Sequence, residues 1–297
     1  MSKILKYKKK KMELFDIILL IFLTVFGALI VFPFYNVIVV SFTTQKEYLL
    51  KPLVLFPSQP TLDSYLTLFE DGRIWIGYRT TLLILALGLP LNMLLTTFMS
   101  YGLSRNNLPG RKLLLYLILF TMLFNGGIIP LYLVMLSLGL TNTIWAVIFA
   151  YGVNTFYFII MRNYFMSLPE SLVESARLDG ASEWRILGQI ILPLSKPIIA
   201  TITLFYTVDR WNEWFNAMIF IRDTDMMPLQ LALRSIVIES QLLNFLSSSG
   251  GAAVNEVHFS MGMKMAAVLL TMLPIMCIFP FLQKHFVKGV LVGAIKA

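Results

Sequence analysis

The sequence is short of charge, cysteine and histidine. Only 13% of its 297 residues are charged, about half the proportion in a typical soluble domain. It has one cysteine, Cys277, which excludes an internal disulfide and a cysteine metal cluster. Because Cys277 lies in an apolar run, we expect a buried small hydrophobe. The two histidines, His258 and His285, fall on opposite sides of the predicted membrane and cannot share a metal.

Motifs of common catalytic sites are also missing. The sequence has no Gly-x-x-x-x-Gly-Lys-Ser/Thr phosphate loop, so we expect no ATP binding by that route. It has no His-Glu-x-x-His zinc motif and no Gly-x-Ser-x-Gly nucleophile elbow. We therefore predict a non-catalytic chain with no metal site and no cofactor of its own. A nucleic-acid role would need basic residues interleaved with polar or aromatic ones on a soluble face, and we find no such stretch.

Hydrophobic runs dominate what is present. Hydrophobic residues make up 58% of the chain and the mean hydropathy is +0.77. The runs predict an all-α integral membrane protein with six transmembrane helices. They cover about 17–40, 80–99, 113–138, 144–160, a stretch from about 198, and 263–282. A cleaved signal peptide would also begin with lysines, but the first run is too long and no small-residue cleavage site follows it.

Basic residues indicate the orientation. Six lysines precede the first run, and Arg105, Arg111 and Lys112 lie between the second and third runs. None lies between the third and fourth. The positive-inside rule therefore places both termini in the cytoplasm. The net charge of +8 is mainly this signal, and we predict a multi-pass membrane protein in contact with the lipid bilayer.

A polar stretch at 168–193 separates the fourth and fifth runs. Ser167 and Glu170 stand in capping-box spacing, which predicts a helix from about Leu168. Leu172, Val173 and Ala176 would form its apolar face, with Glu170, Glu174 and Arg177 facing water or a partner. Gly180 would end this helix. Ser182 would then cap a second helix, with Ile186, Leu187 and Ile190 as its apolar stripe and Pro193 at its end.

This stretch resembles a known motif. Glu174-Ser175-Ala176, then Gly180, then Ile190-Ile191-Leu192-Pro193 is similar to the EAA loop of membrane subunits of ATP-binding-cassette (ABC) importers. Ser175 stands where the motif has alanine, a change between small residues. The string Ala176 to Ser182 looks most like the sugar-importing, MalG-type permeases. A solvated cytoplasmic loop with no partner is the alternative reading.

The resemblance implies a type I importer permease fold and a set of partners. These are a second homologous permease forming a heterodimer, two copies of a cytoplasmic ATPase that binds ATP and magnesium, and an extracytoplasmic solute-binding protein delivering a sugar. It also implies that residues 168–193 dock on the ATPase. The candidate coupling residues are Glu170, Glu174, Ser175, Ala176, Arg177, Asp179, Gly180, Ala181, Leu192 and Pro193. Glu174 would supply a charged contact, and Ala176, Gly180 and Ala181 would permit close packing.

Polar residues inside the runs are candidates for the translocation path. Asn125 lies where Asn-Gly-Gly interrupts the third run, which indicates either a simple kink or a path-lining residue. Asn154 lies within the fourth run. The fifth run leads into Asp209, Trp211, Asn212, Glu213 and Trp214, with Arg210 among them. These residues would either bind sugar or form an interfacial aromatic belt at the outer surface, with Asp209 and Arg210 neutralising each other.

The outer segment after the fifth run contains the predicted short amphipathic helix 228–239 and the small-residue tip Ser248, Ser249, Gly250 and Gly251. The resemblance implies that this tip faces the binding protein. The alternative is a flexible linker with no binding role. We divide the chain into 1–76, with the N-terminal tail, first span and outer loop; 77–283, the permease core with its coupling loop; and 284–297, a cytoplasmic tail.

Other functions were weighed. A secondary transporter would not need the EAA elbow and would be expected to carry acidic residues deep in the membrane. A membrane enzyme would need a nucleophile or metal cluster at one depth. An ABC importer permease for a non-sugar solute is the nearest rival to a sugar permease. Asn-Gly-Gly-Ile-Ile-Pro in the third run resembles a branch associated with oligosaccharides derived from polysaccharides.

Overall fold

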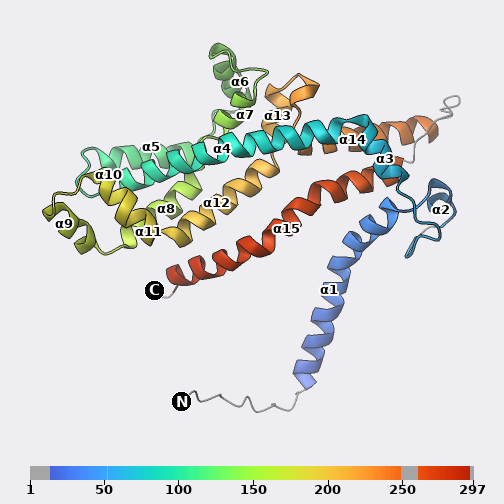
Figure 1. Ribbon diagram of the computed structural model, residues 1–297, viewed down its shortest axis with the longest axis horizontal. Coiled ribbons are helices and arrows are strands. Elements are labelled where there is room, and N and C mark those ends of the chain that lie inside the picture. The colour runs from blue at the N-terminus through green and yellow to red at the C-terminus, as the bar shows by residue number, and fades with distance from the viewer. Residues whose placement is uncertain (1–13, 52, 249–259, 295–297) are drawn as a thin grey trace.

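The computed structural model describes residues 14–51, 53–248 and 260–294, which are helical with no strand among them (Figure 1). The helices are α1 (Leu14–Ser41), α2 (Gln45–Leu50), α3 (Asp63–Asp71), α4 (Arg73–Ser104), α5 (Arg111–Leu123), α6 (Ile128–Ser137), α7 (Ile144–Ala150), α8 (Thr155–Ser167), α9 (Glu170–Leu178), α10 (Glu183–Ile186), α11 (Leu192–Leu194), α12 (Lys196–Trp211), α13 (Phe215–Phe220), α14 (Leu229–Ser248) and α15 (Ser260–Ala294). A π-helical segment, Leu187–Ile191, joins α10 to α11, and a 3-10 turn lies at Thr224–Met226.

The predicted all-α membrane fold is confirmed. Three stretches, Leu14–Ser41, Arg73–Ser104 and Met261–Ile278, are long and apolar enough to cross a membrane. Three more candidate spans are bent pairs: α5 with α6 at 116°, α7 with α8 at 55°, and Glu183–Leu194 with α12 at 83°. Together they allow up to six spans by length and composition. Several helices extend beyond their apolar runs, because a helix continues through polar residues at its ends.

The long helix α4 is the centre of the bundle. It packs against α8, α12 and α14, and α15 packs against α12 and α14. Figure 1 shows α9 and α10 at one end of the bundle, with α2, α3 and α14 at the other. Helix α14 reaches from Leu229 to Ser248, well beyond the predicted end at Glu239.

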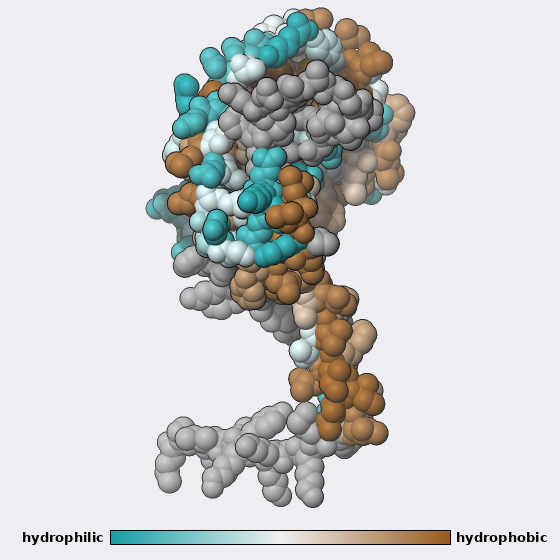
Figure 2. All heavy atoms as spheres, turned by 90° about the vertical axis from the view of Figure 1, so that its right-hand side faces the viewer, coloured by the Kyte–Doolittle hydropathy of each residue, from teal (hydrophilic) through white to brown (hydrophobic). Residues whose placement is uncertain are grey.

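Two helices keep their apolar surfaces outside the bundle. Helix α1 buries only Val39, Val40 and Ser41, and α5 buries no residue. Figure 2 views the end formed by α2, α3 and α14, where hydrophilic residues gather, while hydrophobic ones cover α1. Cys277 is exposed, so the predicted burial of its thiol is wrong for this chain alone. Apolar surface of this extent is suited to lipid or to another membrane subunit.

The interruption at Asn125 is a sharp break. Gly127 has φ 91°, a conformation that glycine adopts without steric cost, and its N–H donates to Asn125 Oδ1 (2.9 Å). Asn125 is exposed.

The domain limits at 76/77 and 283/284 stay predictions. Helix α4 begins at Arg73, and α15 continues across residue 283 to Ala294.

Candidate functional site

Residues 168–193, which pack on α4 and α8, form the first candidate site. We call these residues the elbow. Helix α9 begins at Glu170 after Pro169, and no side chain caps it. The predicted capping box is wrong: Ser167 is the last residue of α8, and its Oγ donates to the carbonyl of Tyr164 (2.8 Å). Because α8 continues to Ser167, this hydroxyl is used by its own helix.

The turn after α9 is formed by Gly180, as predicted. Gly180 has φ 75°, its N–H donates to Arg177 O (3.0 Å), and Ala181 N–H donates to Ala176 O (2.9 Å). This pair of bonds is a Schellman motif, which satisfies carbonyls at a helix end. Ser182 precedes α10 as predicted, without a side-chain bond. The second helix does not end at Pro193 but continues to Leu194, before the bend at Ser195.

The inner face of the elbow packs on its own chain. Val173, Ala176, Ile186, Leu187 and Ile191 are buried in one cluster with residues of α4, α8 and α12. Ala176 is 8% exposed, so its small side chain allows close packing within this chain. Its predicted packing against the ATPase stays a prediction. Leu172 is 41% exposed and does not share the buried face.

The outer face of α9 is free in this chain. Ser171, Glu174, Ser175 and Leu178 follow each other at helical spacing, and all are exposed, Leu178 at 90%. We call these four residues the α9 stripe. Glu170, Arg177, Asp179, Gly180 and Pro193 are also exposed, while Ala181 and Leu192 are half-buried against the inner cluster. The predicted coupling residues therefore divide between a free face and a packed face.

Glu183 ties the elbow to the bundle. Its Oε2 accepts the Tyr101 hydroxyl (2.5 Å), and its Oε1 accepts Arg177 Nε (3.0 Å) and Nη2 (2.8 Å). One carboxylate thus joins α9, α10 and the end of α4. Neither Glu183 nor Tyr101 was among the predicted site residues, because the two lie 82 residues apart and no local pattern signals their contact.

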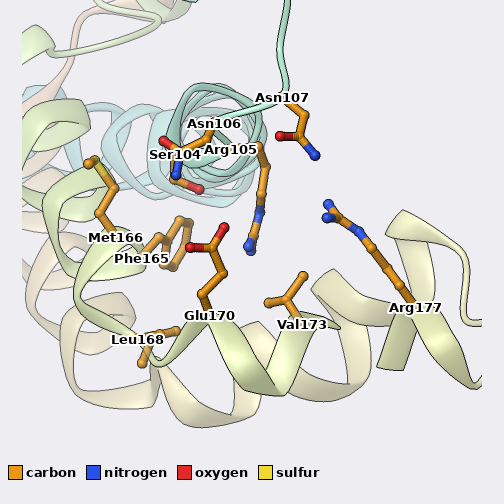
Figure 3. A pocket seen from close by; sticks show the side chains of 10 residues that line it. All are labelled: Ser104, Arg105, Asn106, Asn107, Phe165, Met166, Leu168, Glu170, Val173 and Arg177. Atoms are coloured by element: carbon orange, nitrogen blue, oxygen red, sulfur yellow. The ribbon is translucent and has the colours of Figure 1, made fainter. Parts of the chain in front are cut away.

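A polar cavity lies between α9 and the end of α4 (Figure 3). Arg105, Glu170 and Arg177 are directed into it, and Ser104, Asn106 and Asn107 line it from the α4 side. The Arg105 guanidinium lies over the Tyr101 ring, 4.4 Å from its centroid. Its Nε and Nη2 are buried without a hydrogen-bond partner among the described residues. The cavity holds charges of both signs and forms part of the elbow.

Arg210 organises a second polar region within the bundle. Its side chain is 1% exposed and donates to four acceptors: Asn92 Oδ1 (3.0 Å) and the carbonyls of Val147 (3.0 Å), Ile148 (2.8 Å) and Tyr151 (3.0 Å). The carbonyls are near the end of α7, where the break before α8 leaves them without helical partners. Arg210 therefore fastens the α7–α8 break to α4 and α12.

Asp209 points to a different set of groups. Its Oδ2 accepts the hydroxyls of Tyr157 (2.8 Å) and Tyr151 (3.3 Å). Asn154 Nδ2 donates to the Tyr151 hydroxyl (2.7 Å), and the Asn154 backbone N–H donates to the Tyr206 hydroxyl (3.0 Å). We call Asp209, Tyr151, Tyr157 and Asn154 the carboxylate–tyrosine cluster. Asp209 forms no direct ion pair with Arg210 among the described contacts, so their predicted mutual neutralisation would act only over a longer distance.

This region is level with the middle of a candidate span. Asn92, which binds Arg210, lies near the middle of Arg73–Ser104, a stretch long and apolar enough to cross a membrane. The side chain of Arg210 therefore reaches the middle of that span. The belt of 209–214 at the outer surface stays a prediction.

The remaining path candidates do not join the cluster. Trp211 is 4% exposed, donates its Nε1–H to Thr271 O (3.2 Å) and packs edge-on against Tyr78, so it is a core residue. Asn212 is exposed and bonds within α12, and Glu213 Oε1 accepts the N–H of Asn216. Trp214 lies under the Arg234 guanidinium. Asn125 bonds only locally. The Ser248 backbone ends α14; Ser249, Gly250 and Gly251 lie outside the described residues.

Comparison with known proteins agrees with this architecture. Residues 5–292 match the family described as binding-protein-dependent transport system inner membrane component. The chain is 40% identical to Protein LplC of Bacillus subtilis over 98% of this chain and 97% of that protein. It is also 40% identical to the polygalacturonan/rhamnogalacturonan transport system permease protein YtcP of Bacillus subtilis, over 96% of this chain and 99% of YtcP.

A solved structure has the same fold. A chain from a bacterial ABC transporter involved in the import of the acidic polysaccharide alginate superposes with a TM-score of 0.82 at 28% identity. The match covers 92% of this chain and 96% of that one. With a matching family spanning nearly the whole chain and a shared type I permease fold, the protein belongs to the inner membrane components of binding-protein-dependent ABC transport systems.

Proposed function

We propose that this chain is a permease subunit of an ATP-driven importer of oligosaccharides and that it lines half of the translocation path. The observation that carries the proposal is the free α9 stripe on an elbow that is otherwise fixed to its own bundle. An exposed apolar side chain such as Leu178, beside the charge of Glu174, is the composition of a docking surface.

The geometry supports a mechanism of coupling. A cytoplasmic ATPase would bind the α9 stripe, with Leu178 as the apolar anchor and Glu174 as the charged contact. Closure of the ATPase pair would move α9 as a rigid body. Because Glu183 links α9 and α10 to Tyr101, the movement would pass directly to α4, and through the inner cluster to α8 and α12.

The partners follow from this mechanism. ATP and magnesium would bind to two copies of the ATPase. A second homologous permease would cover apolar surface such as that of α1 and α5 and complete the path. An extracytoplasmic binding protein would deliver cargo to the end formed by α3 and α14. The complex would lie in a bacterial cytoplasmic membrane.

The relatives support an oligosaccharide as cargo. Besides YtcP, they include the arabinooligosaccharides transport system permease protein AraQ of Bacillus subtilis, 27% identical over 96% of this chain and 97% of AraQ. The carboxylate–tyrosine cluster is suited to such cargo, since carboxylates and hydroxyls can bind sugar hydroxyl groups while aromatic rings cover apolar sugar faces.

The test uses the complex purified from membranes with tagged permease. We expect an ATPase and a second permease to co-purify, and ATP hydrolysis to rise with an oligosaccharide and its binding protein. Leu178→Asp and Glu174→Lys should reduce ATPase recovery and uptake while the chain stays in the membrane. Asp225→Lys is the matched control, because it makes a comparable charge reversal at an exposed residue outside the elbow. Normal uptake with both stripe variants would overturn the docking role.

The alternative of a secondary transporter is not supported, because the chain belongs to the inner membrane components of binding-protein-dependent transport systems.

A further inference from the structure

The described spans are almost free of charge in their central parts. Charged residues lie near helix ends, such as Arg79 and Arg162, and Asp209 and Arg210 lie in the last turn of α12, beside the α7–α8 break. Glu213, one turn further along, is bound to Asn216. The charges beside the break that could meet cargo are therefore those of Asp209 and Arg210.

Arg210 is not available to cargo. Its guanidinium is 1% exposed, and its Nε, Nη1 and Nη2 all donate to oxygens of Asn92, Val147, Ile148 and Tyr151. Binding a sugar carboxylate would require this set to break, which would expose four acceptors within the bundle. Arg210 therefore stabilises the bundle and does not bind cargo.

Asp209 is half-buried and retains acceptor capacity. Both printed bonds, from Tyr151 and Tyr157, reach Oδ2, and Oδ1 has no hydrogen bond among those described. A carboxylate has about four acceptor sites in all. A partly exposed carboxylate at this depth faces water or protein rather than lipid. The α7–α8 break at the same place also requires a polar or protein-lined surrounding.

The tyrosines give the surface its shape. The Tyr157 ring lies 5.3 Å from the Phe205 ring and 4.9 Å from the Tyr206 ring, which holds it in place. Its hydroxyl donates to Asp209 and can still accept a hydrogen bond. Fixed acceptors beside aromatic carbon match the hydroxyl groups and apolar faces of a sugar ring.

We propose that Asp209, Tyr157 and Tyr151 form a subsite for the hydroxyl groups of uncharged sugar residues, and that this wall of the path disfavours sugar carboxylates. The inference rests on the proposed function, since it assigns a cargo preference to the same path. The free acceptors of Asp209 and Tyr157 bind hydroxyl donors. A uronate carboxylate meets the charge of Asp209 and, among the described residues at this place, finds only Arg210, whose N–H groups are already bonded. Acidic cargo would need cations from the second permease.

The test compares uptake of two sets of probes by the complete transporter in proteoliposomes. One set is neutral galacto- and arabino-oligosaccharides of three to five units, and the other is oligogalacturonates of the same lengths. The same binding protein feeds every variant, so its own preference cancels in the ratio of acidic to neutral uptake between variant and wild type.

We expect Asp209→Asn to lower neutral uptake about tenfold, as for loss of a charged hydrogen-bond acceptor, and to raise the acidic-to-neutral ratio. Tyr157→Phe, which keeps the ring, should lower neutral uptake about fivefold. Asp225→Asn makes the same chemical change in the exposed 3-10 turn Thr224–Met226 and should have no effect. Co-purification of the partners checks that each variant assembles.

The outcomes separate the two proposals. If wild type shows ATP-dependent uptake but neither Asp209→Asn nor Tyr157→Phe alters neutral uptake or the ratio, the subsite is overturned and the proposed function stands. If both variants lose neutral and acidic uptake equally while remaining assembled, the cargo preference is overturned. If wild type takes up no sugar of either set, the proposed function fails and the subsite fails with it.

Discussion

The elbow and the mid-membrane region both combine an arginine, a carboxylate and tyrosine, but the arginine binds different partners in the two places. At the elbow, Arg177 is 36% exposed and pairs with Glu183, which is 51% exposed and also binds Tyr101. Within the bundle, Arg210 is 1% exposed and binds neutral oxygens, although Asp209 is its neighbour in sequence.

The surrounding medium explains the difference. An exposed ion pair is screened by water and contributes about 0–1 kcal/mol, so it can form and break during a working cycle. A buried guanidinium loses its hydration and must have every N–H satisfied. The elbow contact is therefore suited to guiding movement, and the Arg210 contacts are suited to holding the α7–α8 break in one shape.

Arg210→Lys should have the largest effect. A lysine ammonium has three donors on one atom and cannot reach the four separated acceptors of Arg210. Loss of buried contacts of this kind costs about 3–5 kcal/mol. We expect the variant to lose its monodisperse peak in detergent chromatography and its thermal transition to fall.

Arg222→Lys is the matched control, because Arg222 is exposed and its side chain binds only the Tyr132 hydroxyl among the described contacts. A wild-type transition temperature for Arg210→Lys would remove the contrast between the two regions.

Glu183→Gln should have an intermediate effect that falls on coupling rather than folding. Glutamine keeps the size and one acceptor, but it loses the charge that binds Arg177. We expect a change in unfolding free energy below about 1 kcal/mol and fewer sugar molecules transported per ATP hydrolysed. Parallel assays of uptake and ATP hydrolysis in proteoliposomes measure that ratio.

Tyr101→Phe removes the other partner of Glu183 and should shift the ratio in the same direction. If Glu183→Gln lowers hydrolysis and uptake together, Glu183 affects docking of the ATPase and does not transmit its movement to α4.

The elbow could be predicted from sequence because its residues are contiguous. Spacing alone located Gly180, the start of α10 and the exposed acids of α9. Of the mid-membrane cluster, the sequence indicated Asn154 and Asp209. Their contacts could not be predicted, since Asn92, Tyr151, Tyr157 and Arg210 come from three separate parts of the chain.

Two residues of the fifth run show why. One alternative had the adjacent Asp209 and Arg210 neutralising each other, but successive residues of a helix point about 100° apart. Trp211 was a candidate either for sugar binding or for an aromatic belt, and its position on α12 faces α15 and Thr271. Adjacency in a helical segment is a poor guide to which side chains share an environment.

Glu47 offers the smallest effect and sharpens the comparison, because its setting is intermediate. It is only 9% exposed, but it lies in the outer segment and is bound by Lys51 Nζ (2.6 Å) and by Ser58 through its N–H and hydroxyl. The hydrogen bonds from Lys51 and Ser58 lower the pKa of Glu47 to about 2. A lowered pKa stabilises the segment above the ordinary value near 4.5, and this contribution is lost as the pH falls towards 2. We therefore expect hydrogen exchange at the Ser58 amide, corrected for the intrinsic rate, to stay slow from pH 7 to pH 5 and to accelerate only below pH 4. Glu47→Gln should remove this pH dependence and leave uptake near wild type, whereas an unchanged profile would mean that Glu47 does not hold the segment.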